Sequence, residues 1–107
     1  MNTLRNKINK YKEIKADIVD IDITLSELDD NNLKINELKK IRLKKENQIR
    51  RIDNAITVLK EPYNEIIEEI LIKGKRYSYM QEKLHLSYSR IKQLENEALQ
   101  TIEKYIL

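Results

Sequence analysis

The sequence predicts an all-α protein, with a long N-terminal helical hairpin or coiled coil followed by a small C-terminal three-helix domain. Glycine and proline, which interrupt helices most strongly, each occur once in 107 residues. Charged residues make up 36% of the chain and are mixed with leucine and isoleucine, a composition typical of long helices. We expect the hairpin to span residues 1–60 and the C-terminal domain residues 61–107.

The first helix is predicted to run from Leu4 to Leu28. Its apolar residues recur three and four positions apart in a heptad pattern from Ile14 to Leu28, and Leu4, Ile8 and Tyr11 continue the stripe in a slightly shifted phase. The segment 19–25 alternates as a strand would. A lone strand could not satisfy its backbone hydrogen bonds, however, and we therefore expect helix there. The polar residues 29–32 compete for backbone hydrogen bonds and should end the helix.

A second helix is expected to begin near Leu33 and to be about as long as the first. Equal lengths on the two sides of 29–32 favour an antiparallel hairpin. A hairpin of this size contributes only about 3–5 kcal/mol, so we expect a homodimer formed through the N-terminal helices, which could pair within or between chains. The facing pairs would be Leu4 with Ile56, Ile8 with Ile52, and Tyr11 with Ile49.

Three shorter helices are predicted after residue 60. Pro62 marks the start of the first and Gly74 its end, since proline is tolerated in a first turn and glycine in a left-handed cap. Ser78, with Gln81 three residues later, has the spacing of a capping box for the second helix. This helix should end near Leu84.

The last helix follows the three-residue connection 85–87, with Ser87 as its N-cap. One face of this helix is apolar and the opposite face is polar. This is the pattern of a helix-turn-helix whose second helix reads the major groove. The same pattern also fits an ordinary amphipathic helix of a small bundle. The expected core face consists of Ile91, Leu94, Ala98, Ile102 and Tyr105, with Leu99 and Ile106 on its flank. The polar face consists of Ser89, Gln93, Asn96 and Gln100, flanked by Arg90 and Lys92.

Two stretches of the chain are strongly basic although the net charge is only +3. Residues 39–51 hold seven basic side chains against one glutamate, and residues 73–92 hold six against one. Such local excess suits a polyanionic partner. The alternative is that these are solvated helix faces that keep the protein in solution.

Enzymatic function is not expected from this sequence. Cysteine is absent and His85 is the single histidine, which leaves no nucleophile and base pair and no cluster of metal ligands. We therefore expect neither cofactor nor metal. The N-terminus lacks the apolar run of a signal peptide or membrane span, and the expected location is the cytoplasm, with no membrane partner.

Residues 59–102 resemble the promoter-reading C-terminal domain of bacterial sigma factors, and more closely the short phage regulators of the ArpU and RinA type. The resemblance implies a regulator of phage or mobile-element genes in a bacterial host cell, with double-stranded DNA as partner and RNA polymerase as a further one. The residues that carry it are Leu59, Pro62, Ile66, Ile67, Gly74, Tyr77, Met80, Leu84, Ser87, Ile91, Ala98, Leu99 and Ile102.

The resemblance makes Ser87 the cap of a recognition helix that spans residues 88–106. The chain departs from the family at Gln81, where a small residue is usual, and at His85, which replaces the turn glycine. It also departs at Glu95, which lies close to the apolar face, and at Glu97, which would repel phosphate. We assign Tyr77 to the core and Tyr88 to the DNA backbone. The expected DNA-binding residues are Lys75, Arg76, Ser87, Tyr88, Ser89, Arg90, Lys92, Gln93 and Asn96.

Two other functions fit the sequence. The hairpin could be a protein interaction module that acts on RNA polymerase or a repressor, with the helix-turn-helix as a residual scaffold. A small terminase-like protein that recognises packaging DNA would instead form a ring-like oligomer. The interaction module should show no affinity for duplex DNA, which distinguishes it from the regulator. The terminase-like protein should form an oligomer larger than a dimer.

Overall fold

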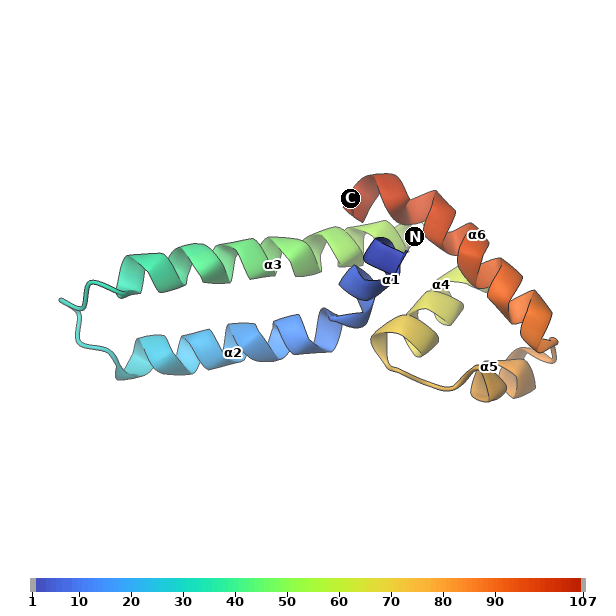
Figure 1. Cartoon of the computed structure of the whole chain (residues 1–107), viewed down its shortest axis with the longest axis horizontal. Helices are drawn as coiled ribbons and strands as arrows, with labels where there is room; N and C mark the ends of the chain where they lie inside the picture. The colour runs from blue at the N-terminus through green and yellow to red at the C-terminus, as the bar shows by residue number, and fades with distance from the viewer. Residues whose placement is uncertain (1, 107) are drawn as a thin grey trace.

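The computed structural model describes residues 2–106, and every regular element in this range is a helix (Figure 1). The prediction of an all-α fold is thereby confirmed. The molecule measures 57 × 26 × 21 Å along its principal axes. In chain order the helices are α1 (Asn2–Asn9), α2 (Tyr11–Glu27), α3 (Ile35–Thr57), α4 (Tyr63–Ile66), the π-helix η1 (Ile67–Ile72), α5 (Tyr77–Leu84) and α6 (Tyr88–Ile106).

Helices α2 and α3 lie side by side and antiparallel, and form an arm that extends away from the other helices (Figure 1). Segment 19–25 is helical despite its alternating pattern. The chain leaves α2 at Leu28 in an extended conformation, directly before the polar segment 29–32, as expected. Across the arm, Arg42 bonds Asp22 at 2.6 Å and Lys45 bonds Asp17 at 3.1 Å.

The predicted continuous first helix was wrong, because the structure breaks it at Lys10, where φ is −83° and ψ is 1°. The break turns α1 out of the arm and against η1 and α6. Leu4 and Ile8 are consequently buried in the main core, and burial of such side chains stabilises a fold by about 1.5–3 kcal/mol each. The free energy gained by burying Leu4 and Ile8 offsets the helical hydrogen bonds that are lost at Lys10.

The main hydrophobic core takes side chains from both sides of residue 60. Leu4 and Ile8 of α1 and Ile52 of α3 belong to the same cluster as Ile67 of η1 and Ile102 of α6. The base of the arm is therefore continuous with the C-terminal helices.

The segment between Pro62 and Gly74 has the predicted bounds but a different internal structure. It begins as α4 and widens into η1, where the backbone N–H of Lys73 bonds the carbonyl of Glu68 at 2.9 Å, the i to i+5 spacing of a π-helix. Gly74 follows with φ of +74°, in the left-handed region as expected. Hydrophobic spacing alone had predicted an uninterrupted α-helix.

Helix α5 begins at Tyr77, one residue before Ser78, which was predicted to be its N-cap. Arg76 occupies the N-cap position in an extended conformation and makes no side-chain capping bond. Ser78 lies inside the first turn, so the predicted capping box with Gln81 was wrong. The helix ends at Leu84, as predicted.

Candidate nucleic-acid interface

The connection between α5 and α6 consists of residues 85–87 and is closed by backbone hydrogen bonds. His85 adopts a left-handed conformation with φ of 55° and ψ of 42°, and its N–H bonds the carbonyl of Gln81. The N–H of Leu86 bonds the same carbonyl at 3.1 Å. His85 thus fills the place that glycine usually takes at the end of a helix, as its position in the sequence had indicated.

Ser87 caps α6 as predicted. Its side-chain oxygen accepts a hydrogen bond from the backbone N–H of Arg90 at 3.1 Å, which satisfies one of the amide groups left free at a helix start. The cap fixes where the helix begins and therefore which side chains of its first turns face outward.

The faces of α6 agree with the predicted pattern, with one exchange at its end. Ile91, Leu94, Ala98 and Ile102 are buried, but Ile106 is buried in place of Tyr105, which is partly exposed. Eight of the nine predicted DNA-binding residues are exposed, and they come from the segment directly before α5, the connection and the first half of α6. These eight are Lys75, Arg76, Ser87, Tyr88, Ser89, Arg90, Gln93 and Asn96.

Lys92, the ninth predicted residue, differs from the others because its ammonium group turns inward. It lies 3.3 Å from a carboxylate oxygen of Glu95 and 3.3 Å from the hydroxyl of Tyr77. Its side chain is only 33% exposed. This cation therefore neutralises a buried charge within the protein.

Tyr77 and Tyr88 pack edge to face beside the connection, with ring centroids 5.3 Å apart and planes at 71°. Tyr77 packs against the hydrophobic core, as predicted. Tyr88 is 51% exposed. One side of its ring packs against Tyr77, and the rest faces solvent next to Ser89 and Arg90.

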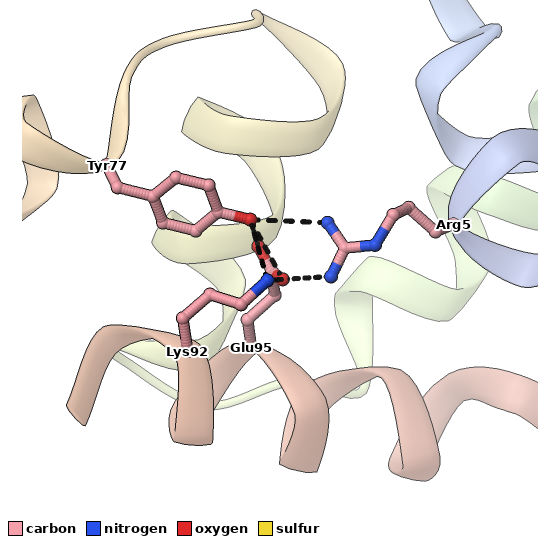
Figure 2. A network of polar contacts seen from close by, with 4 residues as sticks. All are labelled: Arg5, Tyr77, Lys92 and Glu95. Carbon is pink, nitrogen blue, oxygen red and sulfur yellow. Dashed lines mark hydrogen bonds and ion pairs between the residues drawn. The ribbon is translucent and has the colours of Figure 1, made fainter. Parts of the chain in front are cut away.

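A network of polar side chains lies directly under α6 (Figure 2). The Glu95 side chain is fully buried, and its two oxygens lie 3.1 Å and 2.8 Å from the hydroxyl of Tyr77. Arg5 from α1 pairs with the same carboxylate, and this hydrogen bond raises the pKa of Arg5. A buried carboxylate is costly unless it is paired and hydrogen-bonded. Here Arg5, Lys92 and Tyr77 all compensate it.

Sequence reasoning missed this network. The spacing of α6 places Glu95 close to the apolar face, but a helical pattern gives no indication of which cation meets it from a distant segment. Arg5 lies in what appeared to be the continuous first helix of the hairpin. The signal that could have found the contact was a lone acidic residue inside a predicted core face, which requires a partner.

Glu97, the acidic residue expected to repel phosphate, is partly buried and accepts a hydrogen bond from the hydroxyl of Tyr63 at 3.0 Å. This bond raises the pKa of Tyr63. The Glu97 carboxylate is thus bonded to Tyr63 of α4, although Glu97 lies one turn after Gln93 on the same side of α6.

Other kinds of site do not stand out in residues 2–106. No group of three or more histidine, aspartate or glutamate side chains gathers there as metal ligands would. None of the helices described in this range combines the length and apolar character needed to cross a membrane. Comparison with protein families, with characterised proteins and with solved structures finds no match for this chain.

Proposed function

We propose that this protein is a sequence-specific DNA-binding regulator of phage or mobile-element genes, in which α5 and α6 form a helix-turn-helix. The observation that carries the proposal is the outer face of α6, where Ser89, Gln93 and Asn96 are all exposed. They follow directly after a tight three-residue connection, and the opposite face of the same helix is buried. Exposed polar side chains in the first turns of a second helix are placed to contact base edges.

The chemistry of this face fits the major groove. An α-helix about 10–12 Å across enters a groove about 12 Å wide. Gln93 and Asn96 carry amides that can bond adenine, and Arg90 carries a guanidinium that can bond guanine. Lys75 and Arg76 directly before α5, and Tyr88 at the start of α6, are exposed and would contact phosphates, which position a protein without specifying sequence. The sigma-factor-like pattern of residues 59–102 supports the same assignment.

The arm formed by α2 and α3 suits a homodimer. Its outer surface exposes Val19, Ile23 and Leu43, at 57%, 52% and 57%, and a second copy could cover them. A symmetric dimer would place two copies of α6 on half-sites separated by about 34–36 Å, or a multiple of this distance.

A protein interaction module is the second candidate. Leu33, in the turn that joins α2 and α3, is 96% exposed, and its whole side chain is therefore open to an apolar contact with a partner. In this alternative the tip binds RNA polymerase or a repressor, and α6 has no role in DNA binding.

Selection of bound fragments from a genomic library tests the proposal. Purified full-length protein is incubated with the fragments at low and at physiological salt. The proposal expects one or a few upstream sites to be enriched at both salt concentrations. Failure to retain any DNA even at low salt contradicts it and favours the protein interaction module.

A further inference from the structure

A partly open cavity of about 260 Å³ lies where the end of α6 meets α1, α2 and α3. Figure 1 shows these segments converging where the arm joins the C-terminal helices. This place is at the far end of α6 from the connection 85–87, about 27 Å away at the rise of an α-helix. The residues that line it are Lys7, Lys10, Ile14, Gln48, Arg51, Ile52 and Ile106.

Three cations surround the cavity and come from three different places in the chain. Lys7 lies on α1, Lys10 at the break between α1 and α2, and Arg51 on α3. All three are exposed, and none of them takes part in an ion pair within residues 2–106. By contrast, Arg42 and Lys45 further along the arm are paired across it. Like charges gathered around one opening repel each other, and a bound anion would relieve this.

The floor of the cavity is apolar. Ile14, Ile52 and Ile106 line it, and all three are buried, with 8%, 2% and 8% of their surface exposed. The amide of Gln48 adds one polar group that can donate a hydrogen bond. A cationic rim over an isoleucine floor offers separate places for a charged group and an apolar chain.

We propose that this cavity binds a small amphipathic anion, which has a carboxylate or phosphate headgroup on a short apolar chain. Lys7, Lys10 and Arg51 would hold the headgroup, and the isoleucines would contact the chain. The volume fits this class, because an apolar cavity of about 150 Å³ admits benzene and sites for drug-sized molecules begin near 300 Å³. A chain of about eight carbons is therefore a suitable probe. Such a ligand would bridge the arm and the C-terminal helices.

Calorimetric titration of the full chain at low ionic strength tests the inference with four probes. Octanoate and octyl phosphate carry both features, inorganic phosphate lacks the chain, and octyltrimethylammonium has the chain with the opposite charge. We expect both amphipathic anions to bind at least tenfold more tightly than either of the other two. The tighter of the two identifies the preferred headgroup.

Two matched variants locate the site. Arg51→Gln should weaken binding of octanoate and octyl phosphate about tenfold, which is typical for loss of a charge-assisted hydrogen bond. Arg50→Gln removes the same charge from the neighbouring residue, which does not line this cavity, and should leave binding unchanged. Circular dichroism confirms that both variants keep their helices.

Three results would overturn the inference. They are no binding of either amphipathic anion, inorganic phosphate binding as tightly as octyl phosphate, and equal weakening by Arg50→Gln and Arg51→Gln. Because no DNA is present, none of these results depends on the proposed regulatory function.

Discussion

The guanidinium of Arg5 pairs with the carboxylate of Glu95, ninety positions further along the chain. This contact joins α1 to the inner side of α6 (Figure 2). Gln93 and Asn96 are exposed on the outer side of the same helix. The orientation of the proposed reading helix therefore depends on a short N-terminal helix that is remote from it in sequence. Lys92 and Tyr77 complete the shell around the same carboxylate.

Replacement of Arg5 by alanine should lower the free energy of unfolding by about 1–3 kcal/mol. Breaking a buried ion pair costs about 3–5 kcal/mol, but the Arg5 side chain is 25% exposed and Lys92 and Tyr77 remain. Urea unfolding followed by circular dichroism measures the change. Lys7→Ala is the control, because Lys7 lies on the same helix without an ion pair in residues 2–106, and it should stay within about 0.5 kcal/mol. Equal effects of the two variants would contradict this role for Arg5.

Replacement of His85 by glycine should stabilise the fold by about 0.5–1 kcal/mol. A left-handed conformation costs a residue with a β-carbon about 1–2 kcal/mol, and the greater freedom of glycine in the unfolded chain cancels part of the gain. His85→Val, with a β-branched side chain, should be less stable than wild type. Thermal unfolding of the three proteins gives the order directly, and a His85→Gly protein that melts below wild type would refute the expectation.

Stability should fall as the pH rises from 10 to 12 because of Tyr11. Burial, and then the hydrogen bond to Asp53 at 2.6 Å, raise its pKa to about 12. An unfolded tyrosine ionises near about pH 10, so in this interval the folded state holds a proton that the unfolded state has lost. The stabilisation is complete below pH 10 and is lost by pH 12.

Tyr11→Phe isolates this effect. The difference between the ultraviolet titrations of wild type and variant should show a single phenol that ionises near pH 12. The variant should also lose stability less steeply than wild type over the same interval. A difference titration centred near pH 10 would show that burial and the bond to Asp53 do not raise the pKa of Tyr11.

The two kinds of DNA contact should respond differently to mutation. Arg90→Ala should relax the preference at one base position by about 1–3 kcal/mol, whereas Lys75→Ala should weaken all sequences alike and reduce the salt slope by about one. Fluorescence anisotropy with a selected site and a scrambled duplex, at several salt concentrations, measures both. Identical profiles for the two variants would remove the distinction between base and phosphate contacts.

Self-association should depend on the outer surface of the arm. Ile23→Glu places a charge on an exposed apolar side chain and should convert the proposed dimer into monomers without loss of helix content. Thr57→Glu places the same charge on another exposed residue, at the other end of the arm, and as the control it should leave the dimer intact. Analytical ultracentrifugation gives the masses, and a wild-type protein that is monomeric at high concentration would contradict the dimer.

Much of the fold could be predicted from local features. The single glycine, the cap at Ser87 and the apolar spacing of α6 each act within one or two turns, and the structure has them as expected. The break at Lys10 has only a slight shift in the phase of the apolar stripe as its signal, since neither glycine nor proline is there and the stripe continues past it. It results from the burial of Leu4 and Ile8 in a core made mainly by the C-terminal helices.

The remaining differences also come from tertiary contacts. Periodicity cannot distinguish an α-helix from the wider η1 when the same face is buried in both. The outer face of α6 was predictable from spacing, whereas the inward turn of Lys92 depends on Glu95 and Tyr77, which only the folded chain brings together. Ser78 was a suitable cap by residue type, but α5 had already begun at Tyr77.

Selection from a randomised duplex library, with wild type and two variants in parallel, tests the central claim most directly. Gln93→Ala removes an amide proposed to read a base, and Gln100→Ala removes the same group from the same face two turns further along α6. The account predicts one enriched motif for wild type and Gln100→Ala, and the loss of preference at one position of it for Gln93→Ala. Enrichment of no motif by wild type, or of the same motif by all three proteins, would contradict the assignment of α6 as the reading helix.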